Sequence, residues 1–236
     1  MLLYIIRHGT PDYDSDSLLP EGREQAELLS QRLKASGIDE IHSSPQGRAL
    51  ETARPTAELL GLPVIIEPWA RELNEESKTL FPDGVPKTIS HLTAAYLHDP
   101  AFRNCDSERA LAEIPGLSET GFPARYREIS EGLDAMLSSL GYVRNGKGLY
   151  DVKDGNGRHV ALFCHCGMSR VLISHLLHVP YQLLGATLMN HFTGITVFHF
   201  DGDAAEICPE LISYGDVGHL YRDGKPLIHY MKKVPF

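Results

Sequence analysis

His8 and His165 occupy similar places in the sequence, each at the end of a short apolar run and shortly before a glycine. The two runs, 2–6 and 160–164, have the length and composition of buried strands. In open α/β sheets, the loops at the carboxyl ends of the strands form the crevice that binds ligands. A neutral imidazole there can act as a nucleophile, and Arg7 beside His8 offers a planar fork suited to phosphate. These residues are therefore placed to do chemistry, although Arg-His-Gly by itself also fits a strand end that is simply capped in solvent.

Arg48 brings a second guanidinium to this predicted pocket. Residues 43–45, Ser-Ser-Pro, predict a helix start with a hydroxyl N-cap and proline at the first position, which places Arg48 in the first turn. Cys166 and Gly167 open another predicted helix, whose free N–H groups and dipole favour an anion. Two arginines, two histidines and two helix N-termini would form a phosphate-sized positive pocket in a chain with a formal net charge of −9.

Three motifs together resemble the histidine phosphatase superfamily, with its phosphoglycerate-mutase-like fold: Arg7-His8-Gly9, Ser44-Pro45-Gln46-Gly47-Arg48-Ala49 followed by Thr52-Ala53, and Cys164-His165-Cys166-Gly167. The first motif alone is weak, but the three in this order and spacing are specific. The resemblance implies a phosphoenzyme mechanism in which His8 is the nucleophile and takes the phosphoryl group as a phosphohistidine. The residues expected to hold the phosphate are Arg7, Arg48, His165 and Cys166. No metal and no cofactor is expected.

A glutamate after the third predicted strand is expected to protonate the leaving oxygen, because hydrolysis of an alkyl phosphate needs a general acid. Glu72 and Glu75 both fit this role. Segment 67–72 resembles the part of the family sequence that leads to its acid, whereas 73–75 resembles the mutase version of the motif. We favour Glu72 and keep Glu75 as the alternative.

The favoured reaction is hydrolysis of a small-molecule phosphate monoester. One alternative is a cofactor-dependent phosphoglycerate-type mutase, although the loop 10–19 lacks the asparagine and the Gly-Arg-rich continuation usual after Arg-His-Gly in mutases. A metallohydrolase is a second alternative, raised by the 12 histidines, but strand alternation would place His165 on the opposite face from Cys164 and Cys166. A third is a non-catalytic phosphate-binding module that has lost the acid.

The predicted elements alternate between strands and helices, which is typical of an α/β fold. We expect a single domain over 1–236: a three-layer α/β/α sandwich around a mostly parallel central sheet, with a cap inserted at 77–127. The predicted helices are 20–36, 45–60 with a kink or restart at Pro55, 86–97, 123–140 and 167–178. The predicted strands are 2–6, 38–42, 63–66, 194–200, 205–213 and a hairpin of 148–153 with 159–164.

Composition narrows the class of partner. No window holds the roughly 18 apolar residues of a membrane span, and a net charge of −9 argues against nucleic-acid binding. The four cysteines, Cys105, Cys164, Cys166 and Cys208, are too few for a disulfide framework, and no secretion signal is apparent, so we expect a cytoplasmic protein with reduced thiols. The expected partner is a small-molecule phosphate ester, and formation of a homodimer is left open.

Overall fold

The computed structural model describes residues 1–73, 97–103 and 120–222, the strands 78–80, 86–88 and 225–226, and the single residues 113 and 118. Its centre is a six-stranded sheet in the order β13-β11-β1-β10-β4-β5. The neighbours β1, β10, β4 and β5 run parallel, whereas β11 is antiparallel to both β1 and β13. The strands are β1 (Leu2–Arg7), β4 (Glu40–Ser43), β5 (Val64–Ile66), β10 (His159–Cys164), β11 (Ile195–His199) and β13 (Glu210–Asp216).

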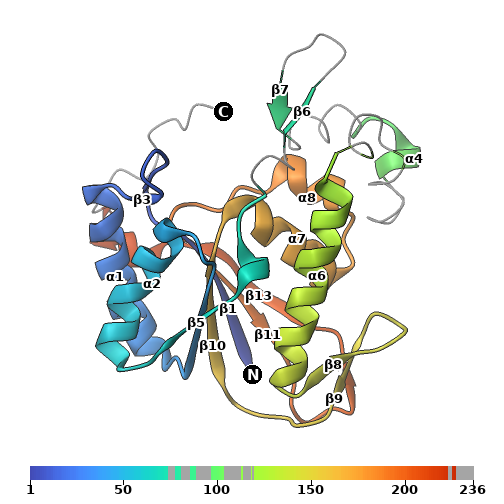
Figure 1. Ribbon diagram of the computed structural model, residues 1–236. Coiled ribbons are helices and arrows are strands. Elements are labelled where there is room, and N and C mark those ends of the chain that lie inside the picture. The colour runs from blue at the N-terminus through green and yellow to red at the C-terminus, as the bar shows by residue number, and fades with distance from the viewer. Residues whose placement is uncertain are drawn as a thin grey trace.

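Helices cover both faces of this sheet (Figure 1). Helices α1 (Pro20–Ser36) and α2 (Gly47–Leu60) lie on one face, and α6 (Phe122–Ser139) and α7 (Cys166–Leu177) on the other. Glycines at 37 and 61 end α1 and α2 in the left-handed conformation, with φ of 68° and 67°. The predicted three-layer sandwich around a mostly parallel sheet is confirmed.

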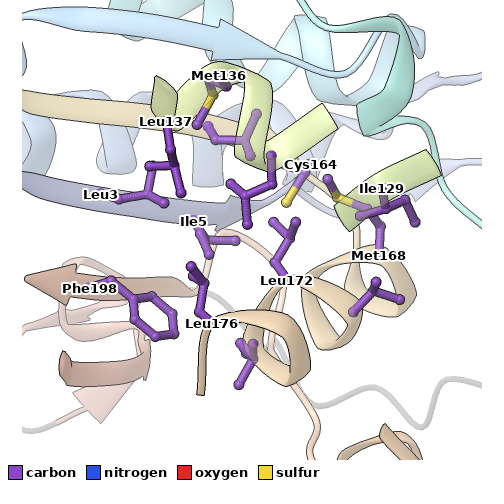
Figure 2. Packing of buried hydrophobic residues seen from close by; sticks show 14 of the residues in the cluster. Leu3, Ile5, Ile129, Met136, Leu137, Cys164, Met168, Leu172, Leu176 and Phe198 are labelled. Carbon is purple, nitrogen blue, oxygen red and sulfur yellow. The ribbon is translucent and has the colours of Figure 1, made fainter. Parts of the chain in front are cut away.

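Side-chain alternation along β1 divides the core in two. Leu3 and Ile5 pack in the cluster beside α6 and α7, which Figure 2 shows, whereas Tyr4 and Ile6 pack in the cluster beside α1 and α2. The neighbouring β10 alternates in the same way. Because both faces of β1 and β10 are covered, both strands are apolar along nearly their whole length.

The strand register sets the position of the predicted motifs. Arg7 pairs with Cys164 across the parallel strands β1 and β10. The His8 N–H donates to the carbonyl of Cys164 at 3.0 Å, and the Ser44 N–H donates to the carbonyl of Phe163 at 2.9 Å. The residues that follow β1, β4 and β10 are therefore tied together at one edge of the sheet.

Smaller elements connect and flank the sandwich. A short antiparallel pair occupies the segment expected to be a loop at 10–19, and a three-stranded sheet in the order β12-β9-β8 lies beyond α6. These elements are β2 (Pro11–Asp12), β3 (Ser17–Leu18), η1 (Pro68–Ala70), β6 (Lys78–Leu80), β7 (Pro86–Thr88), α4 (Pro100–Arg103), β8 (Tyr142–Arg144), β9 (Tyr150–Val152), α8 (Tyr181–Thr187), β12 (Glu206–Ile207), η3 (Gly218–Leu220), β14 (Tyr221–Arg222) and β15 (Lys225–Pro226).

The predicted hairpin of 148–153 with 159–164 is wrong. β10 pairs with β1 and β4, whereas β9 pairs with β8 and β12. β10 is apolar on both faces, so both faces must be covered. Its place in the main sheet provides helices on either side, whereas pairing with β9 outside that sheet would not. The predicted strand 205–213 is likewise divided into β12 and β13, which belong to different sheets.

Two helix predictions also need correction. α2 begins at Gly47, so neither Ser43 nor Ser44 caps it and proline 45 is not its first residue. The same helix runs through Pro55 without a restart, since its buried face continues across the proline with Thr52, Ala53, Thr56 and Ala57. Of the predicted helix 86–97, residues 86–88 form strand β7, paired with β6, and 89–96 lie outside the described residues.

The predicted helix 123–140 is confirmed as α6, and 167–178 as α7, each shifted by one residue. Much of the predicted cap 77–127 lies outside the described residues, so its limits stay a proposal. Within the part of the chain that the structure describes, no helix combines the length and the apolar character needed to cross a membrane.

Candidate active site

His8 follows β1 and is 2% exposed. Its Nδ1 lies 2.7 Å from the carbonyl oxygen of Gly9. Because a carbonyl can only accept, Nδ1 donates its proton and Nε2 keeps its lone pair. Burial, with the charges of His165 and Arg7 close by, lowers the pKa of His8 well below its usual value. The ring is therefore neutral near pH 7, and its Nε2 is available as a nucleophile.

Gly9 joins the first motif to the second. Its N–H donates to the Thr52 hydroxyl at 3.0 Å, and that hydroxyl donates to the Arg48 carbonyl at 2.7 Å. A Cβ on Gly9 would lie 2.7 Å from the carbonyl oxygen of Gly22, so only glycine fits between β1 and α1. The close packing explains why the first motif has a glycine, and the two hydrogen bonds explain why the second has a threonine.

Arg7 ends β1 with its guanidinium held between a backbone carbonyl and an aromatic ring. Its Nη1 donates to the carbonyl of Asn190 at 2.5 Å, and its guanidinium carbon lies 4.0 Å from the centre of the Phe192 ring. The same phenyl ring lies 5.7 Å from the His8 imidazole, centre to centre. The loop before β11 therefore positions both Arg7 and His8.

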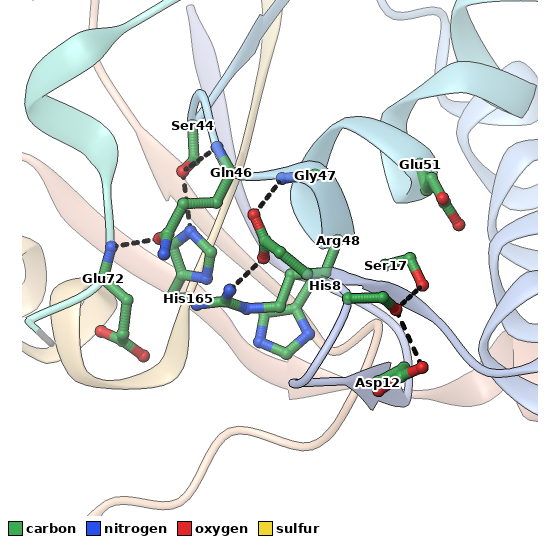
Figure 3. Close-up of polar contacts among 12 residues, drawn as sticks. His8, Asp12, Ser17, Ser44, Gln46, Gly47, Arg48, Glu51, Glu72 and His165 are labelled. Atoms are coloured by element: carbon green, nitrogen blue, oxygen red, sulfur yellow. Dashed lines mark hydrogen bonds and ion pairs between the residues drawn. The ribbon is translucent and has the colours of Figure 1, made fainter.

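Arg48 lies in the first turn of α2, as predicted, and is 6% exposed. Its Nη1 forms an ion pair with Asp16, whose other carboxylate oxygen accepts the Gly47 N–H at 2.7 Å (Figure 3). Asp16 has a left-handed φ of 47°. The anion at this helix N-terminus is thus a side chain of the loop between β1 and α1.

His165 is fully buried between β10 and α7. Its ring centre lies 5.2 Å from that of His8, so the two histidines meet as the sequence predicted. Its Nε2 contacts the Ser44 hydroxyl at 2.7 Å. Burial and the charges of Arg48 and Arg7 lower the pKa of His165 well below its usual value.

Glu72 lies at the N-terminus of α7. Its carboxylate accepts the N–H groups of Gly167 at 3.2 Å and Met168 at 2.9 Å, while its own N–H donates to the side-chain oxygen of Gln46 at 2.6 Å (Figure 3). The free N–H groups of α7 that were expected to attract phosphate are therefore occupied by a glutamate. Glu75, the alternative acid, lies outside the described residues.

Cys166 is the first residue of α7 and is partly exposed. Its Sγ lies 3.9 Å from both the Met189 sulfur and the Asn190 carbonyl oxygen. The thiol therefore faces the loop that also holds Arg7. Its predicted contact with phosphate stays a proposal.

Arg125 on α6 was not singled out in the sequence. It is 2% exposed, and its Nη2 donates to the carbonyls of Trp69 at 2.7 Å and Arg71 at 2.5 Å. The segment just before Glu72 is therefore clamped to α6. Asn190 and Phe192 were not predicted from the sequence either. Like Arg125, each lies far from the motifs in the sequence and reaches the site only through folding.

Three of the residues whose charges act on His8 carry a buried nitrogen atom that has no hydrogen-bond partner in the described part of the chain. Among the described residues, Arg7 Nε, Arg48 Nε and His165 Nδ1 are buried and accept or donate no hydrogen bond. Leaving such donors unpaired costs free energy, and a tetrahedral oxyanion has the acceptors to satisfy them. The arrangement can bind a phosphoryl group and place its phosphorus next to His8.

The chain thus combines a three-layer α/β/α sandwich with two histidines and two arginines at one sheet edge. Residues 3–109 match the model of the histidine phosphatase superfamily (branch 1), a stretch that contains the first two motifs. The resemblance predicted from the motifs is confirmed.

Curated relatives point in the same direction. The chain is 25% identical over 215 residues to "Putative phosphoserine phosphatase 2" of Hydrogenobacter thermophilus, covering 87% of this chain and 92% of the relative. It is 38% identical over 81 residues to "Probable phosphoglycerate mutase GpmB" of Photorhabdus laumondii, but spans only 38% of that protein. The family match and the relative named as a phosphoserine phosphatase support a phosphatase-type hydrolase.

Solved structures share the fold over nearly the whole chain. A phosphoserine phosphatase mutant from Entamoeba histolytica, in complex with phosphoserine, has a TM-score of 0.61 at 22% identity and covers 93% of this chain and 99% of its own. A mycobacterial glucosyl-3-phosphoglycerate phosphatase has a TM-score of 0.57 at 23% identity, covering 91% and 98%. At these identities, the likeness concerns the fold.

Proposed function

We propose that this protein hydrolyses a small-molecule phosphate monoester through a phosphohistidine on His8, without a metal ion. One observation carries the proposal: the contact of His8 Nδ1 with the Gly9 carbonyl leaves Nε2 unprotonated. Burial keeps this ring neutral, and the charges of Arg7 and Arg48, whose Nε atoms have no partner among the described residues, act on it. Nucleophile and cationic donors are therefore placed together before substrate arrives.

In the first step, His8 Nε2 attacks phosphorus and the bond from phosphorus to the ester oxygen breaks. Phosphoryl transfer asks the protein mainly for positioning and for positive charge around the phosphoryl oxygens. Arg7, Arg48 and His165 supply that charge and the donors. Glu72 protonates the departing oxygen, so that an alcohol leaves rather than an alkoxide.

In the second step, water attacks the phosphorus of the phosphohistidine and the phosphorus–nitrogen bond breaks. Glu72, now ionised, takes the proton from that water, and inorganic phosphate leaves. His8 returns to its starting tautomer because the Gly9 carbonyl continues to accept the Nδ1 proton. Glu75 is the alternative proton carrier.

Trapping of the intermediate tests this proposal. Wild-type protein mixed with a labelled monoester and quenched without acid is expected to carry the label, and His8→Ala to carry none. We expect His8→Ala to release phosphate at least about 1,000-fold more slowly. His199→Ala, which changes a half-exposed histidine of β11, is the matched control. Absence of label on the wild type during turnover would refute the covalent mechanism.

A substrate panel identifies the leaving group. Phosphoserine and glucosyl-3-phosphoglycerate head this panel because similar proteins are named for them. A phosphoglycerate mutase is the second candidate, favoured by the 38% identity over 81 residues. Rapid interconversion of phosphoglycerates without release of phosphate from any monoester would favour the mutase over the phosphatase.

A further inference from the structure

The contact between Ser44 and His165 has no role in the mechanism above. The sequence predicted a helix cap from the hydroxyls of Ser43 and Ser44, but α2 begins only at Gly47. The Ser44 side chain instead reaches across to β10, where its Oγ lies 2.7 Å from His165 Nε2 (Figure 3). Both residues are fully buried. A hydroxyl and an imidazole in contact inside the core must share their protons in a definite way.

Hydrogen-bond accounting assigns the proton between them. The Gln46 N–H donates to Ser44 Oγ at 3.3 Å, so this oxygen already accepts one bond. The Ser44 hydroxyl proton then needs an acceptor, and His165 Nε2 is the acceptor within reach. The reverse assignment would give Oγ two donors and leave the buried hydroxyl proton without an acceptor, which is costly.

The other ring nitrogen faces the proposed phosphate site. Burial and neighbouring arginines favour the neutral imidazole, which carries one proton. With Nε2 acting as acceptor, that proton lies on Nδ1, which has no partner in the described part of the chain. Figure 3 shows Ser44 on one side of the His165 ring and His8 with Arg48 on the other.

We propose that Ser44 is a positioning residue that holds His165 in the Nδ1–H tautomer, so that Nδ1 donates a hydrogen bond to a phosphoryl oxygen. The role in turnover rests on the proposed function, whereas the tautomer does not. Without the hydroxyl, the ring is free to move its proton to Nε2, which would present a lone pair to the phosphate. A repulsive contact would then replace a donor during transfer.

Nitrogen NMR of the histidine-labelled protein measures the tautomer directly. We expect His165 in the wild type to have a protonated Nδ1 and an unprotonated Nε2, with its resonances identified by their loss in His165→Gln. Ser44→Ala is expected to lose this preference, and Ser44→Thr, which keeps a hydroxyl, to retain it. A protonated Nε2 in the wild type would overturn the proposal, even if Ser44→Ala failed to fold.

Kinetics provide the second readout. We expect Ser44→Ala to lower kcat about 10- to 100-fold with a smaller change in KM, and Ser44→Thr to restore most of the rate. Ser130→Ala is the matched control, because the hydroxyl of this buried serine donates to the Tyr126 carbonyl within its own helix, away from His165. Equal losses in Ser44→Ala and Ser44→Thr would overturn the role in turnover.

Failure of the two proposals can be told apart. If His165 has the expected tautomer and no phosphate monoester is hydrolysed, the proposed function fails and the assignment of Ser44 to the ring stands. If hydrolysis proceeds through His8 while Ser44→Ala keeps the wild-type rate and tautomer, the Ser44 proposal fails alone.

Discussion

The Glu72 carboxylate accepts the backbone N–H of Gly167 at 3.2 Å, which joins the proposed acid to the helix that follows His165. A Cβ at position 167 would lie 2.8 Å from Glu72 Oε1, so glycine permits this approach. The contact brings together two segments that are 95 residues apart in the chain. It also makes the role of Glu72 testable, because a carboxamide keeps an acceptor for the helix but cannot deliver the proton.

Glu72→Gln is expected to lower kcat about 100-fold or more on alkyl phosphates, which need a protonated leaving group. The loss on p-nitrophenyl phosphate is expected to be small, since nitrophenolate leaves readily without a proton. Glu75→Gln is the control. If Glu72→Gln slows both substrates equally, Glu72 is not the acid. If only Glu75→Gln shows a loss that depends on the leaving group, Glu75 is the acid.

Arg125→Lys is expected to reduce the free energy of unfolding by about 2 kcal/mol. A lysine cannot donate to the Trp69 and Arg71 carbonyls together from the same position, so one of these partly buried carbonyls loses its bond. Urea unfolding measures the change. Arg127→Lys, at an exposed position of the same helix, should leave the stability within about 0.5 kcal/mol of wild type; an equal effect of the two substitutions would argue against the clamp.

Gly132→Ala is expected to destabilise the protein by about 1–3 kcal/mol, although alanine normally favours a helix interior. The added Cβ would lie 2.2 Å from Cγ of the Trp69 indole, which packs on α6 at this point. Thermal unfolding followed by circular dichroism measures whether the substitution lowers or raises the stability. Gly157→Ala, where a Cβ meets open space, is the control. A stabilised Gly132→Ala protein would show that Trp69 moves aside at little cost.

His42 is expected to stabilise the fold in a pH-dependent way. Burial acts to lower its pKa, but hydrogen bonds to Glu67 and Glu40, both 2.7 Å long, outweigh burial and raise the pKa. Among the described residues, the charges facing His42 include these two carboxylates and Arg158, which lies 3.7 Å from Glu40. This contribution is complete below about pH 6.5, the unfolded value, and is lost as the pH rises through the raised folded pKa.

The measurement is the free energy of unfolding of wild type and His42→Gln between about pH 6 and pH 9. The difference between the two proteins is expected to shrink as the pH rises. His8 and His165, whose folded pKa values are lowered, bind protons in the unfolded state below about pH 7.5 and so add to the slope of each protein. They add equally to both proteins, and their contribution cancels in the difference. His199→Gln serves as the control on an exposed histidine. If the difference in free energy of unfolding stays constant across the range, Glu67 and Glu40 do not stabilise a protonated His42.

Local pattern predicted the main elements well, because a strand covered on both faces must be apolar throughout and an amphipathic helix must repeat its buried residues. β1, β10, α1, α6 and α7 were found at nearly their true limits for this reason. The predicted pairing of β10 is wrong because a strand pairs where its apolar faces are covered. The neighbouring strand in the sequence need not lie in such a place.

The chemical groups of the site can be read from the sequence: His8, His165, Arg7 and Arg48 are recognisable because each lies at the end of a strand or in the first turn of a helix. How those groups are held depends on the folded structure. Asp16 at α2, Glu72 at α7, Ser44 on His165 and Arg125 on the segment before Glu72 are contacts between distant parts of the chain. No local pattern encodes them, because a hydrogen-bond partner is chosen by proximity in the folded protein rather than by spacing in the chain.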